Sequence, residues 1–317
     1  MLPGGAPRST ADLVCYHGNQ SSIHDSLADH QNTTLTTLKL FERLNSFGSL
    51  NKVVYASAGC AAAAKTFDEA TATTEDASIS LYHDSPYAIS KLIGEMYGNY
   101  YFLQYGLPFV KARFQNVYGP GEILGAGRWR GTPHTVWRNV TPSFVWRALH
   151  HEKLPVDNGG IASRDFIFVD DLVRGLLACA LHGESGEVHN LASGIETSIL
   201  DLAHLTNELT DNPAPLALTP ACSWDHSGRR FGAMEKARSR LKFAATSSLR
   251  DGLARTIEWR QANRDLIASR ILQHARFMPN CAPLTGECVA HSYGCRRSPA
   301  ILLRRRAFLG LSPLATT

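Results

Sequence analysis

The sequence predicts an α/β protein built on a parallel sheet, with a smaller second lobe. Three short apolar runs, at residues 11–18, 51–59 and 107–114, are rich in Val, Leu, Tyr and Phe and lack the strict alternation of a half-exposed strand. Such runs are typical of parallel strands that are buried on both faces. Helical patterns separate them, and alternating strands and helices favour one sheet with right-handed crossovers.

The first covering helix is predicted between the first two strands. Four apolar side chains recur there along one side and the pattern ends near Gly48. They are Leu35, Leu38, Phe41 and Leu44. A long loop follows the second strand and leads into a helix that carries the segment SPYAISKL, residues 85–92.

After residue 120 the pattern becomes less regular. Residues 123–142 are rich in Gly, Arg, Trp and Thr, which predicts an extended loop. The segments after the loop mix strand and helix patterns, and we expect from them a smaller α/β lobe over residues 121–263. They are a helix from residue 142, a strand running into a helix over 165–183, a strand at 187–194, a helix from 197 and two short helices within 234–263.

The composition indicates a protein that stays in the cytoplasm. The 317 residues are 44% hydrophobic and 19% charged, which is enough to bury a large core. The sequence contains no run of 18 apolar residues and no basic, apolar leader, so we expect neither a membrane span nor a signal peptide. The seven cysteines form no C-x-x-C pair, which favours reduced thiols, and the seven-residue spacing of Cys281, Cys288 and Cys295 is not a usual zinc pattern, so we expect no metal site.

The net charge of +4 comes from the end of the chain. Residues 264–317 hold eight Arg against Asp265 and Glu287, which leaves the rest of the chain at −2. A nucleic-acid surface needs basic residues gathered on a folded face, so we expect no nucleic-acid partner. We predict that this basic tail is irregular; a contact of the tail with a membrane surface or a partner is the alternative.

Tyr87 and Lys91 form the pattern most suggestive of chemistry. A spacing of four places both side chains on one helical face, about a turn apart, so the ammonium can lie near the phenol. The motif alone is common in proteins. The alternative is an amphipathic helix with an exposed lysine.

Six motifs in order give the sequence a family resemblance. They are VVYAS (53–57), SPYAISK (85–91), RFQNVYGPG (113–121), SRDFIFVDDLVRGL (163–176), GEVHNLASG (186–194) and SLRDGLARTIEW (248–259). Over about residues 11–263 the chain resembles the NAD-dependent epimerase/dehydratase family, the extended short-chain dehydrogenase/reductases that act on nucleotide sugars. The resemblance implies a Rossmann-like cofactor domain in residues 1–120 and a mainly substrate-binding lobe in 121–263.

The resemblance also implies a role for each candidate residue. Tyr87 would be the base that takes a proton from a sugar hydroxyl, with its pKa held below 10 by Lys91 and the oxidised nicotinamide. Lys91 would also bind the nicotinamide ribose, and four further residues would contact NAD or lie beside it: Tyr16, Gly18, Gln20 and Ala56.

Three polar residues of the second half would bind the nucleotide sugar. Arg164 and Arg230 suit its diphosphate because a guanidinium meets two phosphate oxygens at once, and Asn116 would lie near the sugar. The sequence leaves three alternatives open. Arg164 could instead pair with Asp170 or Asp171, Asn116 could be a turn residue, and Arg229 could replace Arg230.

Two features depart from the family pattern. Ala58 stands where relatives carry a catalytic Ser or Thr, so either Ser57 takes that role or Tyr87 lacks its partner, and Gly59-Cys60 cannot replace the Asp-Glu pair of the dehydratases. No G-x-x-G-x-x-G turn is present, so the cofactor domain is expected to be incomplete at its N-terminus, with the strand at 11–18 on the sheet edge and weak binding of NAD.

The prediction is therefore an NAD-dependent nucleotide-sugar epimerase of the UDP-glucose 4-epimerase type. The first alternative is a truncated or impaired relative that binds a sugar nucleotide without turnover. The second is a nucleotide-sugar dehydratase or decarboxylase. The resemblance further implies a homodimer formed through the helices that contain Leu38–Leu44 and Ile89–Tyr100.

Overall fold

The computed structural model describes residues 22–23, 25–47, 50–63, 66–122, 139–221, 228–267 and 269. All of them belong to the unit Met1–Pro283. The predicted strand at 11–18, most of the predicted loop at 123–142 and nearly all of the basic tail lie outside these residues.

A three-stranded parallel sheet forms the centre of the fold, which confirms the predicted α/β class. Its strands are β1 (Val53–Ala58), β2 (Phe109–Phe114) and β7 (Val188–Leu191), in the order β1-β2-β7. Ala58 pairs with Phe114, and Phe114 pairs with Leu191, so the carboxyl ends of all three strands meet at one edge. This edge is where ligands bind in sheets of this kind.

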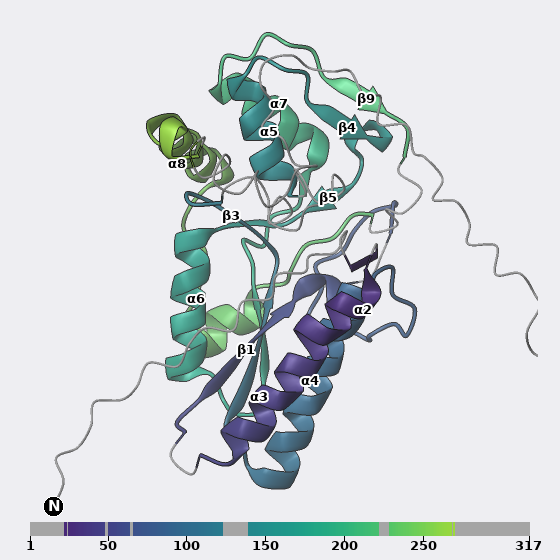
Figure 1. Ribbon diagram of the computed structural model, residues 1–317, viewed down its shortest axis with the longest axis vertical. Helices are drawn as coiled ribbons and strands as arrows, with labels where there is room; N and C mark the ends of the chain where they lie inside the picture. The colour runs from purple at the N-terminus through teal and green to yellow at the C-terminus, as the bar shows by residue number, and fades with distance from the viewer. Residues whose placement is uncertain are drawn as a thin grey trace, which may run out of the picture. The chain divides into compact units, whose positions relative to one another are not determined.

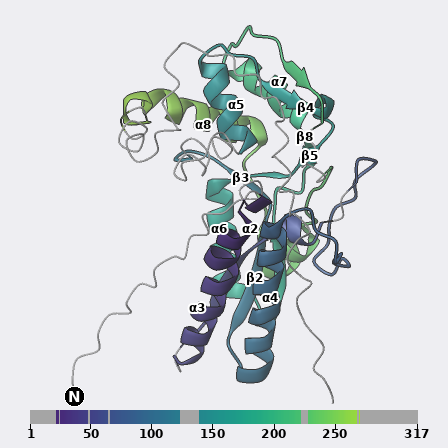
Figure 2. The ribbon, with the colours of Figure 1, turned by 45° about the vertical axis from the view of Figure 1, so that its right-hand side comes forward.

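Helices cover both faces of this sheet. On one face α3 (Thr36–Asn45) packs beside α4 (Pro86–Tyr105), and their residues enclose an aromatic cluster centred on Phe41, Tyr55 and Phe109. On the other face α6 (Val169–His182) covers Val110 of β2. Phe109 and Val110 contact different helices because successive residues of a strand point to opposite faces of the sheet. Figures 1 and 2 both show α3 and α4 lying side by side.

The first covering helix differs from its prediction. It begins earlier, as α2 (Ser26–Asp29), continues as a π-helix, η1 (His30–Leu35), and ends as α3. Phe41 is buried, whereas Leu35, expected on the same apolar side, is 37% exposed. At 3.6 residues per turn, six residues along the helix leave these two side chains about 120° apart.

The second half is built from short pairs of strands packed with helices. The strand pairs are β3 (Asn116–Tyr118) with β6 (Phe166–Phe168), β4 (Pro155–Asp157) with β9 (Ala217–Thr219), both parallel, and β5 (Ser163–Arg164) with β8 (Thr197–Ser198), antiparallel. The helices are α5 (Val140–Leu149), α7 (Ile199–Leu209) and α8 (Leu249–Ala262), with the π-helix η6 (Ala237–Leu241). A core around Tyr118, Phe144 and Leu202 joins α5, α7 and α8 to β3, β4 and β6, whereas Leu241 of η6 packs in the core that includes residues of α6 and β2. Among the helices described, none has the length and apolar character that a bilayer crossing needs.

Candidate active site

Tyr87 and Lys91 lie together on one face of α4. The helix starts where the sequence favours a start: the Ser85 hydroxyl accepts the Ala88 N–H at 3.3 Å, and Pro86 is the first helical residue. Tyr87 is therefore fixed in the first turn. The Lys91 ammonium lies 5.7 Å from the centre of the Tyr87 ring, so the structure brings the predicted pair into proximity.

Lys91 connects this helix to the carboxyl end of β1. Its ammonium donates to the Ala56 carbonyl at 2.9 Å and lies 5.6 Å from the Tyr55 ring centre. The Tyr55 hydroxyl in turn donates to the Lys91 carbonyl at 3.2 Å. Lys91 is only 6% exposed, whereas Tyr87 is half-buried, so the alternative of an exposed lysine on an amphipathic helix is wrong.

Ser57 points toward α4, but its hydroxyl is already bonded. It is buried and donates to the Glu95 carboxylate at 2.5 Å. That carboxylate also accepts two bonds from the Arg113 guanidinium, at 2.9 and 2.8 Å. Ala58, the next residue, is buried and carries no hydroxyl. Ser57 thus belongs to a buried polar cluster in this structure.

Gln115 occupies the space beside Gly59, and sequence reasoning did not identify it. A Cβ at Gly59 would collide with the Gln115 side-chain amide, which also lies against Gly232. Any side chain at position 59 would have to displace this amide. A carboxylate at that position, as in the Asp-Glu pair of the dehydratases, would require the Gln115 side chain to move.

The three residues predicted to bind the nucleotide sugar lie in or next to the short strands of the second half. Asn116 begins β3 and its backbone N–H donates to the Asp165 carbonyl at 2.9 Å, so its assignment as a turn residue is wrong. Arg164 in β5 is half-buried and donates to the Gly228 carbonyl at 2.6 Å. The Arg230 N–H donates to the Ser163 hydroxyl at 3.3 Å.

The ion pairs in the structure bear on the alternatives that the sequence left open for these arginines. Asp170 pairs with Arg255 at 2.8 Å and Asp171 pairs with Arg174, so neither carboxylate needs Arg164. Arg229 forms two bonds to Glu196, at 2.8 and 3.1 Å, and these bonds lower the pKa of the Glu196 carboxyl. The guanidinium of Arg229 is therefore engaged by Glu196, and Arg230 is only 8% exposed.

Asp165 ties this region to the sheet, and its role was also missed. It is fully buried between Arg164 and Phe166, and its carboxylate accepts the backbone N–H groups of Ser193, at 2.7 Å, and Gly194, at 2.9 Å. Burial raises the pKa of this carboxyl, although these bonds oppose the shift. Asp165 holds the loop after β7 against β5 and β6.

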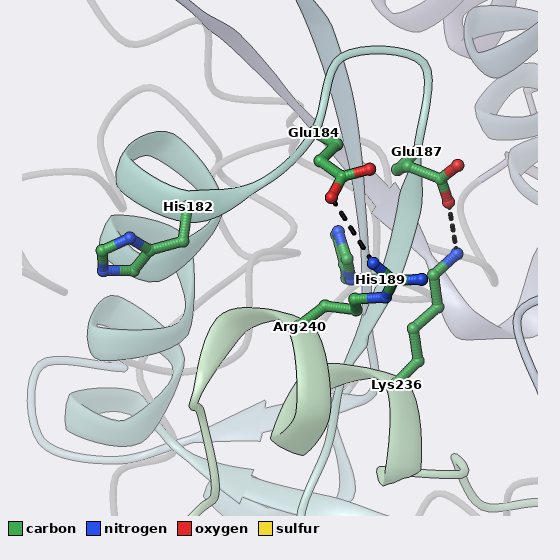
Figure 3. Close-up of a pocket in the computed structure, with 6 residues that line it drawn as sticks. All are labelled: His182, Glu184, Glu187, His189, Lys236 and Arg240. Atoms are coloured by element: carbon green, nitrogen blue, oxygen red, sulfur yellow. Dashed lines mark hydrogen bonds and ion pairs between the residues drawn. The ribbon is translucent and has the colours of Figure 1, made fainter.

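A cavity of about 180 Å³ lies at the other edge of the sheet, where β7 begins (Figure 3). Six residues line it: His182, Glu184, Glu187, His189, Lys236 and Arg240. Its cations already face its carboxylates, since Lys236 lies 2.5 Å from Glu187 and Arg240 lies 3.6 Å from Glu184. It contains no predicted site residue, and we place the candidate site at the carboxyl edge instead.

The described residues suit one end of a nicotinamide cofactor. A half-buried phenol, a neighbouring ammonium and the exposed Ala56 meet at the carboxyl end of β1. The phenol and the ammonium can bind a ribose hydroxyl and lie beside a nicotinamide ring. Tyr16, Gly18 and Gln20, predicted to contact the same cofactor, lie outside the described residues. Within the described ranges no group of three or more His, Cys, Asp and Glu could hold a metal ion.

Comparison with known proteins gives consistent matches. The model of the family described as "NAD dependent epimerase/dehydratase family" matches residues 8–192. The enzyme WbmF of Bordetella bronchiseptica, solved in complex with NAD+ and UDP, is 56% identical, with a TM-score of 0.70, over 84% of this chain and 75% of that one. The epimerase Mth375 of Methanothermobacter thermautotrophicus is 35% identical, with a TM-score of 0.72, over 81% of this chain and 73% of that one.

Curated relatives include enzymes of another reaction class. The dTDP-D-glucose 4,6-dehydratase of Mus musculus is 26% identical over 186 residues, which are 56% of this chain and 48% of that protein. This chain thus spans about half the length of that relative. Both epimerases and dehydratases are similar to it.

Proposed function

The chain belongs to the NAD-dependent epimerase/dehydratase family, and from this premise we propose that it is a nucleotide-sugar epimerase of the UDP-glucose 4-epimerase type that uses NAD. One observation carries the proposal: the Lys91 ammonium lies 5.7 Å from the centre of the Tyr87 ring, at the carboxyl edge of the sheet. The nucleotide is proposed as UDP because the 56% identical WbmF was solved with UDP.

Tyr87 acts as the acid and base on the sugar hydroxyl. A phenol near neutral pH takes a proton only when its ionised form is stabilised, and a cation within a few ångströms does this. Lys91 supplies that cation, and its bond to the Ala56 carbonyl holds it in place. When bound, NAD would accept a hydride from the sugar carbon and return it to the other face of the ring. Tyr87 gives its proton back to the same oxygen.

Arg164 and Arg230 hold the diphosphate, and Asn116 lies toward the sugar. The Gly228 carbonyl bond orients the Arg164 side chain, and the Ser163 hydroxyl bond anchors the backbone of Arg230. An epimerase is favoured over a dehydratase because the two residues after Ala58, Gly59 and Cys60, offer no carboxylate.

The second candidate is a relative that binds the sugar nucleotide without turnover. Ala58 favours it, because no hydroxyl stands at that position, and the Ser57 hydroxyl is engaged by Glu95. The two candidates differ in one measurement. Binding of UDP-glucose without interconversion of the sugar, in the presence of NAD, supports the second candidate.

The test is turnover of UDP-glucose by the full chain with NAD, followed by NMR. Tyr87→Phe should lower turnover by about 100- to 10,000-fold, because it removes the proton-transfer group, and should leave the melting temperature unchanged. Tyr105→Phe, an exposed residue at the end of the same helix, is the matched control and should keep full activity. Equal turnover by Tyr87→Phe and the wild type would refute the assigned role.

A further inference from the structure

The face of α4 that carries Tyr87 and Lys91 continues with a buried carboxylate. Glu95 follows at the same spacing of four, so the three side chains lie in a row along one side of the helix. Glu95 is 4% exposed and is held by both arms of the Arg113 guanidinium, which is 3% exposed. This two-bond geometry fixes direction as well as distance.

The pair of Glu95 and Arg113 is connected to every strand of the central sheet. Ser57 on β1 donates to the same carboxylate, and Arg113 lies on β2, directly beside Ser57 in the sheet register. The remaining arm of Arg113 donates to the Glu75 carbonyl at 3.1 Å. The Glu75 side chain accepts the Asn190 N–H of β7 at 2.8 Å. Each nitrogen of the guanidinium and both oxygens of the carboxylate therefore form a hydrogen bond inside the protein.

The other polar contacts of α4 with the sheet are single bonds: Lys91 to the Ala56 carbonyl, the Tyr55 hydroxyl to the Lys91 carbonyl, and Lys111 to the Asn99 side chain. None of them is a two-bond contact like that of Arg113 with Glu95. The close approaches of Gly94 to Tyr55 and of Gly98 to Phe109 are apolar, and apolar attraction has no direction. A roll of about 10° moves a side-chain tip roughly 6 Å from the helix axis by about 1 Å. A displacement of this size can cost about 100-fold in rate.

We propose that Glu95 and Arg113, together with Ser57, form a clamp that sets the rotation of α4 and so positions Tyr87 and Lys91 at the carboxyl end of β1. Within this clamp Ser57 is a positioning residue and not the hydroxyl that contacts the substrate. The reaction that the clamp serves rests on the proposed function, but the orientation of Tyr87 can be measured without it.

The kinetic experiment compares Ser57→Ala with a double variant, Glu95→Met with Arg113→Met. Replacing both partners of a buried ion pair by apolar side chains of similar volume preserves folding in many proteins, whereas removing one partner leaves a buried charge. The double variant should lower kcat by about 30- to 100-fold and change KM by less than about threefold, since the diphosphate is held elsewhere. Ser57→Ala should lower kcat by about threefold, because the two Arg113 bonds to Glu95 remain.

Two kinetic outcomes overturn the clamp. One is a folded double variant with the kcat of the wild type. The other is a loss in Ser57→Ala as large as that of the double variant, which makes Ser57 a catalytic hydroxyl. Thr206→Val, buried in α7 away from α4, controls for a loss of stability alone. If the double variant does not fold, Arg113→Lys keeps the charge without the paired bonds and takes its place.

A measurement on Tyr87 itself separates the clamp from the proposed reaction. With ¹³Cζ-labelled tyrosine, the Tyr87 resonance is identified as the one missing in Tyr87→Phe. The double variant should change its shift and move its titration midpoint toward about 10, the value for a free phenol. An unchanged resonance and midpoint overturn the clamp. If these change while the wild type shows no turnover of UDP-glucose, the clamp stands and the proposed function fails.

Discussion

Acidification should destabilise this protein through His189, a buried residue of β7 that lines the cavity in Figure 3. The side chain is 1% exposed, and neither ring nitrogen has a hydrogen-bond partner among the described residues. Burial, together with the nearby Lys236, Arg240 and Lys111, lowers the pKa of this imidazole from 6.5 to about 4, although Glu187 opposes the shift.

The direction and magnitude of the stability change follow from the pKa of 6.5 in the unfolded chain and the pKa of about 4 in the folded protein. Between pH 6.5 and 4 the unfolded chain protonates this imidazole and the folded protein does not, so stability is lost as the pH falls through that window. The full shift corresponds to about 3 kcal/mol. Between pH 7 and pH 5 it amounts to about 2 kcal/mol of the free energy of unfolding.

Urea denaturation of wild type and His189→Leu at pH 7 and at pH 5 tests this account. The wild type should lose about 2 kcal/mol more than the variant, because the variant has no imidazole to protonate. Leu191→Ala, a buried apolar residue of the same strand, is the control and should lower stability by a similar amount at both pH values. If wild type and His189→Leu lose the same free energy, the buried neutral imidazole is not the cause.

Two further predictions concern α4. Gly98→Ala should lower the free energy of unfolding by about 1–3 kcal/mol, because the added Cβ would collide with the Phe109 ring. Urea denaturation measures this change. An unchanged free energy of unfolding would mean that the helix can move away at no cost. The outward face of the same helix exposes Ile89 (43%), Met96 (54%), Tyr100 (48%) and Leu103 (74%), so we expect a homodimer by light scattering. Leu103→Glu should shift it to a monomer, and a wild type that is monomeric at high concentration contradicts this expectation.

The elements that the sequence predicted well are those with strong local signals. β1 and β2 follow from apolar runs, and the start of α4 follows from Ser85 and Pro86. The π-helix at His30–Leu35 has no such signal, since a wide turn differs from an ordinary one by a single residue. Three-residue strands such as β3 and β4 are too short to show a periodicity.

The candidate site was predictable where residues lie close in sequence and not where they meet through the fold. Tyr87 and Lys91 are one turn apart, so their approach follows from helix geometry. The bonds from Arg113 and Ser57 to Glu95 depend on the pairing of β1 with β2, which a single sequence does not give. Lys111 and Arg113, two charged residues inside a strand predicted to be buried, were the available signal of buried partners.

Gly94 and Gly98 make the Tyr87 and Lys91 geometry depend on the pairing of β1 with β2. Each glycine inside a helix costs about 1 kcal/mol relative to alanine, so α4 is a weak helix by itself. The same glycines let α4 approach the Tyr55 and Phe109 rings closely. The packing energy of these contacts offsets the cost only after β1 and β2 have paired. The Tyr87 and Lys91 geometry is therefore a property of the assembled sheet, and any event that separates β1 from β2 removes its support.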